Sequence, residues 1–369
     1  MITNAVPARP VTTFSAPLDR ERDVAYAPSV LRWPDRRLLI QRGESEAVAV
    51  GLDEGAGRQT RFPAPWPRRF GTFTVAPDGE LAVFAGVHAV RAVDRSGTVR
   101  WEVRHGCWAG DCRVLHESYE EYADSRAHRY ADSGSAVFSA DGSLVWAHVR
   151  GPVASAGPDP EALDEWLVID AADGRVLGRV DTETVAAGSE HVPHPDPAQM
   201  GLSVGEGQDG APLLWGRWDG KELSVAQFGE QERILTSVSP TGEHFLTVSH
   251  DLDSLALHRV VDGEVVAELS AEGTVPRHPE ADPDDHDADE VMWDYECGFV
   301  DDARAITSTD QEEECGPVRH WLLRAKDMRP TARIEYPFPV SGTPTALGDG
   351  TWYTVSEDEG TLQLWTLDE

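Results

Sequence analysis

Residues 234–251 read ILTSVSPTGEHFLTVSHD, and residues 254–270 read SLALHRVVDGEVVAELS. Apolar and small polar residues alternate there or run in groups of four or five, which is typical of half-buried or central strands rather than helices. Turn residues interrupt this pattern, with Pro240 and Gly242 in the first turn and Asp262-Gly263 in a later one. The two stretches therefore predict four short β-strands joined by tight turns.

Variants of this unit recur along the whole chain. They follow one another at roughly 40 to 50 residues, which is the repeat length of a four-stranded propeller blade. We therefore predict an all-β fold, a single seven-bladed β-propeller domain over residues 1–369. The blades are expected at residues 29–62, 71–104, 135–181, 200–230, 234–270, 296–337 and 342–367.

The last predicted blade lacks its fourth strand. Residues 342–367 offer three strands, whereas residues 11–16 form an isolated strand with no partner nearby in the sequence. An open junction would leave unpaired strand edges, which favour aggregation. We therefore predict that residues 11–16 pair with the outside of the last blade, at residues 362–367, and close the ring.

Turns of the Pro-Asp-Gly type follow the first strand of a unit, as at residues 77–79, and the chain ends on the strand LQLWTL at residues 362–367. These features resemble bacterial WD40-like propeller repeats over nearly the whole chain. The Trp-Asp dipeptide of such repeats lies elsewhere here, at residues 218–219 and 293–294, and the Gly-His signature is missing. The resemblance implies a propeller that serves as a binding platform, and it transfers no catalytic residues.

Charge and hydropathy exclude two classes of partner. The chain has 65 acidic against 32 basic side chains, a formal net charge of −33 at pH 7. A surface this acidic repels phosphate backbones, so no nucleic-acid partner is expected. No stretch approaches the roughly 18 apolar residues of a membrane helix, and residues 1–19 lack the pattern of a secretory signal. We expect a cytoplasmic monomer without membrane contact.

The long insertions are expected on one face of the propeller. In a blade with strands A to D from the centre outward, the B–C loops and the links to the next blade share a face. The long predicted links are residues 106–132, 182–199 and 271–296, joined there by the B–C loops 152–165 and 311–317. Because rigid scaffolds usually carry binding residues on such loops, we predict a non-catalytic protein- or peptide-binding surface there. Tolerated surface insertions are the alternative.

Two tryptophans and an acidic run in these links are the candidate partner contacts. The run lacks the glycine-turned spacing of a calcium loop, so it favours attraction of a basic partner, with a solvated loop as the alternative. The candidate binding residues are Trp108, Trp293, Asp282, Asp284, Asp285, Asp287, Asp289 and Glu290.

The sharpest candidate for chemistry is His105-x-Cys107-x4-Cys112-x3-His116. Two thiolates and two imidazoles within twelve residues are a ligand set that suits tetrahedral zinc. A Cys107–Cys112 disulfide and plain structural roles for these side chains remain the alternatives. No other cofactor is expected.

A second pattern is His191-x-x-His194-x-Asp196, whose side chains suit a His/His/carboxylate metal site. Three prolines, at positions 193, 195 and 197, make this segment extended, so no helix sets the ligand geometry. If either pattern binds metal, the alternative function is a metal-dependent lyase or hydrolase. Its histidine-containing site would lie at the mouth of the central channel.

Overall fold

The structure is a computed structural model that describes residues 4–53, 58–110, 112–151, 163–229, 232–279, 291–310 and 318–368. Strands dominate it, with short turns of 3-10 helix between them. The chain divides into two compact units, unit 1 (Met1–Ala16 with Phe228–Glu369) and unit 2 (Pro17–Gln227). Within the described ranges, no helix combines the length and the apolar character needed to cross a membrane.

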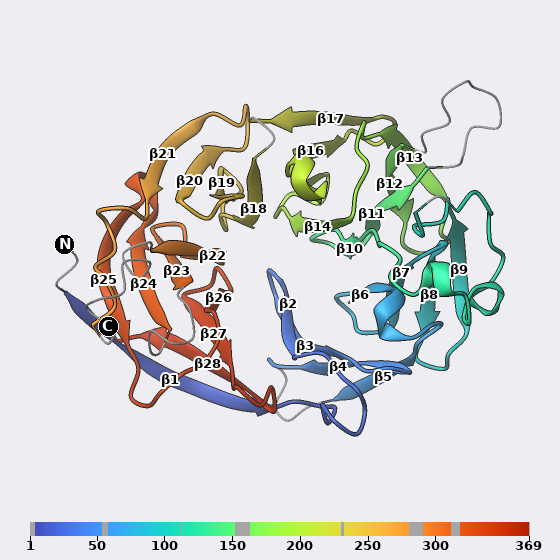
Figure 1. Ribbon diagram of the computed structural model, residues 1–369. Coiled ribbons are helices and arrows are strands. Elements are labelled where there is room, and N and C mark those ends of the chain that lie inside the picture. The colour runs from blue at the N-terminus through green and yellow to red at the C-terminus, as the bar shows by residue number, and fades with distance from the viewer. Residues whose placement is uncertain are drawn as a thin grey trace. The chain divides into compact units, whose positions relative to one another are not determined.

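The described part of unit 2 contains four antiparallel sheets of four strands, and in each sheet neighbouring strands are consecutive in the chain (Figure 1). The strands are β2 (Ser29–Trp33), β3 (Arg36–Arg42), β4 (Glu46–Gly51) and β5 (Gln59–Pro63); β6 (Gly71–Val75), β7 (Leu81–Gly86), β8 (Ala89–Asp94) and β9 (Val99–Arg104); β10 (Ala136–Phe138), β11 (Leu144–Arg150), β12 (Asp164–Asp170) and β13 (Val176–Asp181); and β14 (Gly188–Pro193), β15 (Gln199–Gly205), β16 (Leu213–Trp218) and β17 (Leu223–Phe228).

Burial follows the position of a strand within its sheet. Five of the six residues of β7 are buried, whereas Trp101 is the buried residue of β9. Middle strands covered on both faces therefore read as continuous apolar runs, while outer strands alternate. Trp101 donates from Nε1 to the carbonyl of Ala171 at 2.9 Å. A Cβ on Gly174, whose φ is +75°, would lie 2.5 Å from that indole ring, so glycine is required where the two sheets meet.

Tryptophans on the strands fill space between neighbouring sheets of unit 2. Trp146 and Trp166 are fully buried, and their ring centroids lie 5.4 Å apart. A Cβ on Gly216 of β16 would approach both rings within 3 Å, so the next sheet presses directly against the indole pair. Four further strand tryptophans are buried in the same way: Trp215, Trp321, Trp352 and Trp365.

Unit 1 contains one four-stranded sheet, formed by residues 233–270, and one larger sheet. The four predicted strands of residues 234–270 are present as β18 (Arg233–Val238), β19 (His244–Ser249), β20 (Ser254–Arg259) and β21 (Val265–Ser270). The larger sheet has eight strands in the order β22-β23-β24-β25-β1-β28-β27-β26. Its strands are β22 (Met292–Asp301), β23 (Arg304–Asp310), β24 (Arg319–Arg324), β25 (Arg329–Glu335), β1 (Ala5–Ser15), β28 (Thr361–Leu367), β27 (Thr351–Val355) and β26 (Thr345–Ala346).

The predicted pairing of the leading strand with the last strand is confirmed. β1 pairs antiparallel with β28 from Ala8 opposite Leu367 to Ser15 opposite Thr361. Its first residues also pair in parallel with β25, with Ala5 opposite Arg333, so β1 joins two sets of strands into one sheet. The strand begins at Ala5 rather than at residue 11. Pro7 and Pro10 have no backbone donor, so the first half of the strand resembles a loop in the sequence.

The predicted start of the fourth unit is wrong. Its first strand is β14 (Gly188–Pro193), not a strand at residue 200. The link predicted over residues 182–199 is therefore two short connections, 182–187 and 194–198, at opposite ends of β14. The sequence GSEHVP hides this strand because it carries one β-branched residue and a terminal proline, a composition that sheets tolerate at edge positions.

Strand β1 offers a test through its buried residue Ala8, which packs in a cluster with Trp352 and Trp365. We expect Ala8→Asp to cost on the order of 3 kcal/mol, because it buries an unpaired charge, and to release strand edges that promote aggregation. Thr12→Asp, on an exposed position of the same strand, should change stability by less than about 0.5 kcal/mol. Urea unfolding and size-exclusion chromatography measure both effects, and equal stability of the two variants would contradict this role of β1.

Candidate metal centre

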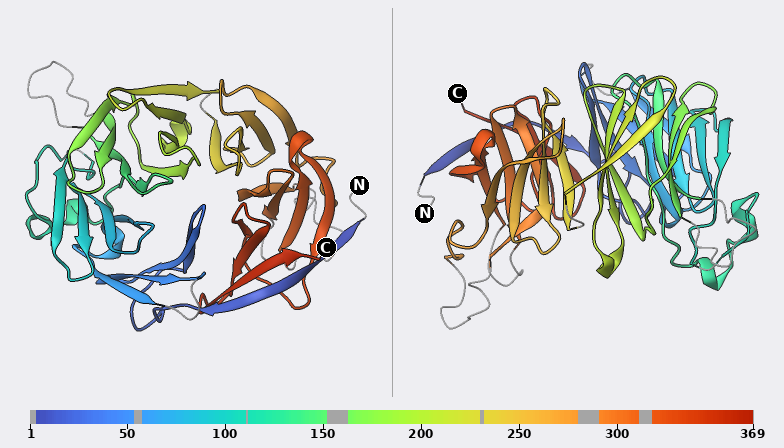
Figure 2. Two further views of the ribbon diagram at one scale, coloured as in Figure 1. Left: turned by 180° about the vertical axis from the view of Figure 1, so that it is seen from behind. Right: turned by 90° about the horizontal axis from the view of Figure 1, so that it is seen from above.

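The link between β9 and β10, residues 105–135, folds over the ends of neighbouring strands within unit 2 and projects beyond them (Figure 2, right). Its described part contains two single 3-10 turns, η2 (Tyr119–Glu121) and η3 (Arg126–His128). Backbone bonds anchor its start: the amide of His105 donates to the carbonyl of His88 at 2.9 Å, and that of Gly106 donates to Arg150 at 2.9 Å. The link therefore starts against the β7–β8 turn and the end of β11.

Aromatic side chains continue this anchoring into the core of unit 2. Tyr122 is 1% exposed, and its hydroxyl lies 2.7 Å from Nδ1 of His88. The ring of Phe70 lies 5.9 Å from that of Tyr122, in an edge-on arrangement. Trp108 is buried in the same cluster. The part of the link that carries Trp108 and Tyr122, called its root below, thus belongs to the folded core.

The two tryptophans predicted as partner contacts are buried. Trp108 is 2% exposed and Trp293 is 0% exposed, and the indole of Trp293 donates to the carbonyl of Leu269 at 3.2 Å. Neither ring is accessible to a partner, which corrects that prediction. Both belong to the hydrophobic core because large aromatic rings gain more by filling core space than by facing water. Outside the described residues lie the acidic candidates Asp282, Asp284, Asp285, Asp287, Asp289 and Glu290.

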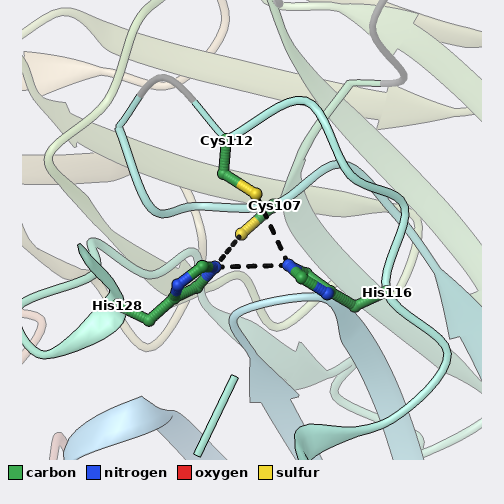
Figure 3. Close-up of side chains that lie close together, drawn as sticks. All are labelled: Cys107, Cys112, His116 and His128. Carbon is green, nitrogen blue, oxygen red and sulfur yellow. Dashed lines mark hydrogen bonds between the residues drawn. The ribbon is translucent and has the colours of Figure 1, made fainter. Parts of the chain in front are cut away.

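Four side chains of the link converge on one point (Figure 3). One ligand atom from each of Cys107, Cys112, His116 and His128 lies within 4.8 Å of all the others. The sulfur of Cys107 is 3.4 Å from Nε2 of His128, and the sulfur of Cys112 is 3.4 Å from Nε2 of His116. The two Nε2 atoms face each other at 3.2 Å.

Polar groups lie behind each histidine of the cluster. Nδ1 of His116 lies 3.0 Å from a carboxylate oxygen of Glu121, and this hydrogen bond lowers the pKa of Glu121. Nδ1 of His128 lies 3.0 Å from the hydroxyl of Ser125. The ring of Tyr122 stacks on that of His128 at 5.0 Å. Both imidazoles are thereby fixed with Nε2 pointing into the cluster.

The two cysteines of the cluster are free thiols in the structure. The backbone amide of Ala109 donates to the sulfur of Cys107 at 3.4 Å. Burial raises the pKa of the Cys107 thiol to about 12. Without a cation, this thiol therefore stays protonated at neutral pH and is a poor nucleophile.

Three residues of the predicted zinc pattern, Cys107, Cys112 and His116, lie together in the structure, whereas the fourth, His105, does not join them. His105 lies outside the group: its amide continues the β8–β9 pairing, and its Nδ1 lies 2.7 Å from the carbonyl of Gly106. His128 takes its place. Sequence spacing did not find His128 because eleven residues separate it from His116, and its only signal was that it is a histidine in the same link.

The second metal pattern does not form a cluster within the described ranges, where the Cys107 group alone brings three or more ligand-type side chains together. His191 lies on β14 in the core, with Nδ1 2.7 Å from the hydroxyl of Ser135 and Nε2 accepting from Trp166 at 2.9 Å. His194 accepts from the backbone amide of Asp196 at 2.9 Å. Strand pairing therefore assigns these imidazoles to packing and turn formation.

Neither a protein-family model nor a curated protein matches the sequence. Solved structures do match in fold. A chain of the Mitotic Checkpoint Complex is 11% identical with a TM-score of 0.54, covering 100% of this chain and 94% of that one. A prolyl endopeptidase, one of two described together, is 11% identical with a TM-score of 0.55. The match covers 93% of this chain and 50% of the endopeptidase chain. The β-propeller domain of Cps50 (Swd1) from Myceliophteria thermophila is 10% identical, with a TM-score of 0.38 over 81% of this chain and 97% of that one.

This is a β-propeller repeat fold. At such identities the likeness concerns the fold alone, and it agrees with the antiparallel four-stranded sheets built from consecutive strands. The propeller repeat explains why the cluster lies in a link between sheets, since the strands themselves are occupied by core packing.

Buried imidazoles give the protein a pH dependence with a defined sign. Burial lowers the pKa of His148 to about 3 and that of His320 to about 4, and holds the pKa of His191 well below its usual value. These groups are neutral in the folded state but take up protons when unfolded, at a pKa of about 6.5. Stability should therefore fall as the pH drops from about 6.5 towards 4, by up to about 2 kcal/mol for each group at pH 5.

Urea unfolding at pH 7.5, 6 and 5 measures this loss, with a chelator present throughout so that no metal equilibrium contributes. Asp164 acts in the opposite sense, because burial raises its pKa to about 6 and it takes up a proton while folded. His250→Gln is the control, since that side chain is 46% exposed and should leave the pH profile unchanged. A free energy of unfolding that stays constant between pH 7.5 and 5 would refute the assignment.

Proposed function

We propose that this chain is a seven-bladed, closed β-propeller that acts as a non-catalytic scaffold for a protein or peptide partner. The sheet topology supports the blade count: beside the five four-stranded sheets, the eight-stranded sheet consists of β22–β25 and of β26–β28 with β1, which makes seven sets of four strands. In this proposal β1 is the fourth strand of the last blade and closes the ring.

The observation that carries the proposed binding role is the link 105–135. Its root is buried, yet it presents large apolar side chains to solvent: Leu115 is 60% exposed and Tyr130 is 84% exposed. A rigid element that displays apolar and aromatic groups loses little conformational entropy on binding, which favours affinity. We therefore assign partner recognition to this link.

Charge and cysteine chemistry support the remaining parts of the proposal. The net charge of −33 attracts a basic partner and speeds its association at low salt. The same charge makes copies of this chain repel one another, which favours a monomer. Free thiols at Cys107, Cys112 and Cys297 fit a reducing compartment such as the cytoplasm. The neighbour from the Mitotic Checkpoint Complex belongs, by its name, to a complex, in line with a scaffold.

Affinity purification of the tagged full chain from its own host cells, followed by quantitative mass spectrometry, tests the proposal. We expect Leu115→Asp with Tyr130→Asp to reduce the enrichment of the partner at least tenfold, because two charges replace apolar contacts in the recognition surface. Raising the salt concentration should weaken capture by the wild-type chain.

The matched control is Val261→Asp with Val265→Asp in unit 1, which adds the same charge at positions 73% and 49% exposed. This control should retain the partner. Equal capture of the same proteins by both double variants would show that the link is not the recognition surface, provided that circular dichroism shows both variants folded.

A further inference from the structure

We propose that Cys107, Cys112, His116 and His128 are the four ligands of a structural Zn²⁺ site that fixes the link 105–135. The inference goes beyond the scaffold role, because metal content and partner capture are separate measurements. It replaces His105, the ligand expected from spacing, with His128.

Three distances within the cluster match those of a tetrahedral site. With Zn–S bonds of about 2.3 Å and Zn–N bonds of about 2.0 Å, neighbouring sulfur and nitrogen ligands lie about 3.5 Å apart and two nitrogens about 3.3 Å apart. The observed S–N separations are both 3.4 Å, and the N–N separation is 3.2 Å. These three separations therefore match the spacing that a shared cation imposes, and all four ligand atoms lie within 4.8 Å of one another.

The hydrogen bond to Glu121 fixes the required tautomer of His116. Because a carboxylate oxygen of Glu121 can only accept, Nδ1 of His116 carries the proton and the lone pair of its Nε2 points into the cluster. Carboxylate and hydroxyl partners behind metal-bound imidazoles orient the ring and raise its basicity. Glu121 and Ser125 have this position behind His116 and His128. The hydroxyl of Ser125 can accept the Nδ1 proton of His128, which leaves the Nε2 lone pair of that ring pointing into the cluster as well. Both nitrogens, 3.2 Å apart, can then bind one cation.

The donor set selects the metal. Two thiolates and two imidazoles suit Zn²⁺, whereas Ca²⁺ and Mg²⁺ prefer oxygen ligands. Four protein ligands complete a tetrahedral shell and leave no position for a substrate, which distinguishes a structural site from a catalytic one. Burial of Cys107, His116 and His128 also keeps water away from the cluster. The same argument disfavours a metal-dependent enzyme at this centre.

A cross-link is physically useful at this place in the fold. The link has single 3-10 turns where sheets have continuous ladders, so few backbone bonds offset the entropy lost when it is ordered. A cation that ties Cys107 near its start to His128 near its end contributes its binding free energy to the folding of that segment. We therefore expect loss of the metal to loosen the link while the sheets stay folded.

The first experiment uses the unmodified full chain, purified after expression in zinc-supplemented medium. Elemental analysis should find about one zinc per chain. Exchange for Co²⁺ should give the intense visible bands of a tetrahedral ion and a sulfur-to-cobalt charge-transfer band, and chelation should make the link sensitive to limited proteolysis. Less than about a tenth of an equivalent of zinc, an octahedral Co²⁺ spectrum, or a Cys107–Cys112 disulfide found by mass spectrometry would overturn the site.

The second experiment identifies the ligands through matched pairs. His128→Gln should lower zinc content at least fivefold, whereas His105→Gln should retain it, because His105 bonds to Gly106. Cys112→Ser should likewise lose zinc, whereas Cys297→Ser, at a buried free cysteine of unit 1, should keep it. Zinc retained by His128→Gln and lost by His105→Gln would overturn the ligand set. X-ray absorption of the wild-type zinc protein, showing two sulfur and two nitrogen neighbours, tests the same set without variants.

Discussion

Pairing of strand edges is the constraint on which unit 1 depends. A sheet edge exposes a row of backbone donors and acceptors that will pair with any available strand. One side of β1 satisfies the edge of β28, and its first residues satisfy part of the edge of β25. Only Ala8 of this strand is buried, so its contribution is mainly hydrogen bonding rather than apolar burial. A segment more than 300 residues away in sequence thus completes a sheet that the C-terminal strands alone leave open.

Because each four-stranded sheet forms from consecutive strands, the connections between these sheets contribute few strand-pairing hydrogen bonds and can vary in length. The link 105–135 is long, and contacts other than strand pairing stabilise it. Its backbone approaches the neighbouring strands so closely that a Cβ on Gly106 would lie 2.3 Å from the carbonyl of Gly151, and one on Gly134 would lie 1.9 Å from that of His148. Glycines permit this contact, and Tyr122 with Trp108 adds apolar burial beneath it.

Most of the strands could be predicted from the sequence because their signals are local. The opening repeat of residues 234–270 forms its four strands as expected, since alternating patterns and glycine turns act over a few residues. The strand β14 was not predicted, because an edge strand with a proline and few apolar residues resembles a loop. Ligand grouping is harder still: His128 joins Cys107 through the three-dimensional course of an irregular link, and no periodicity encodes that course. Trp108 illustrates the same limit, because a tryptophan in an insertion can be either a surface contact or part of the core.

The position of the cluster relates the two proposals physically. Leu115 and Tyr130 stand one and two residues from the candidate ligands His116 and His128, so fixing those imidazoles also fixes the exposed side chains. A surface held in place before binding avoids the ordering cost that a mobile loop incurs on association. The sheets gain nothing from such a cross-link, since their ladders are complete without it. The benefit of a link fixed by a metal would therefore fall on its exposed side chains, which is the physical reason to seek the partner there.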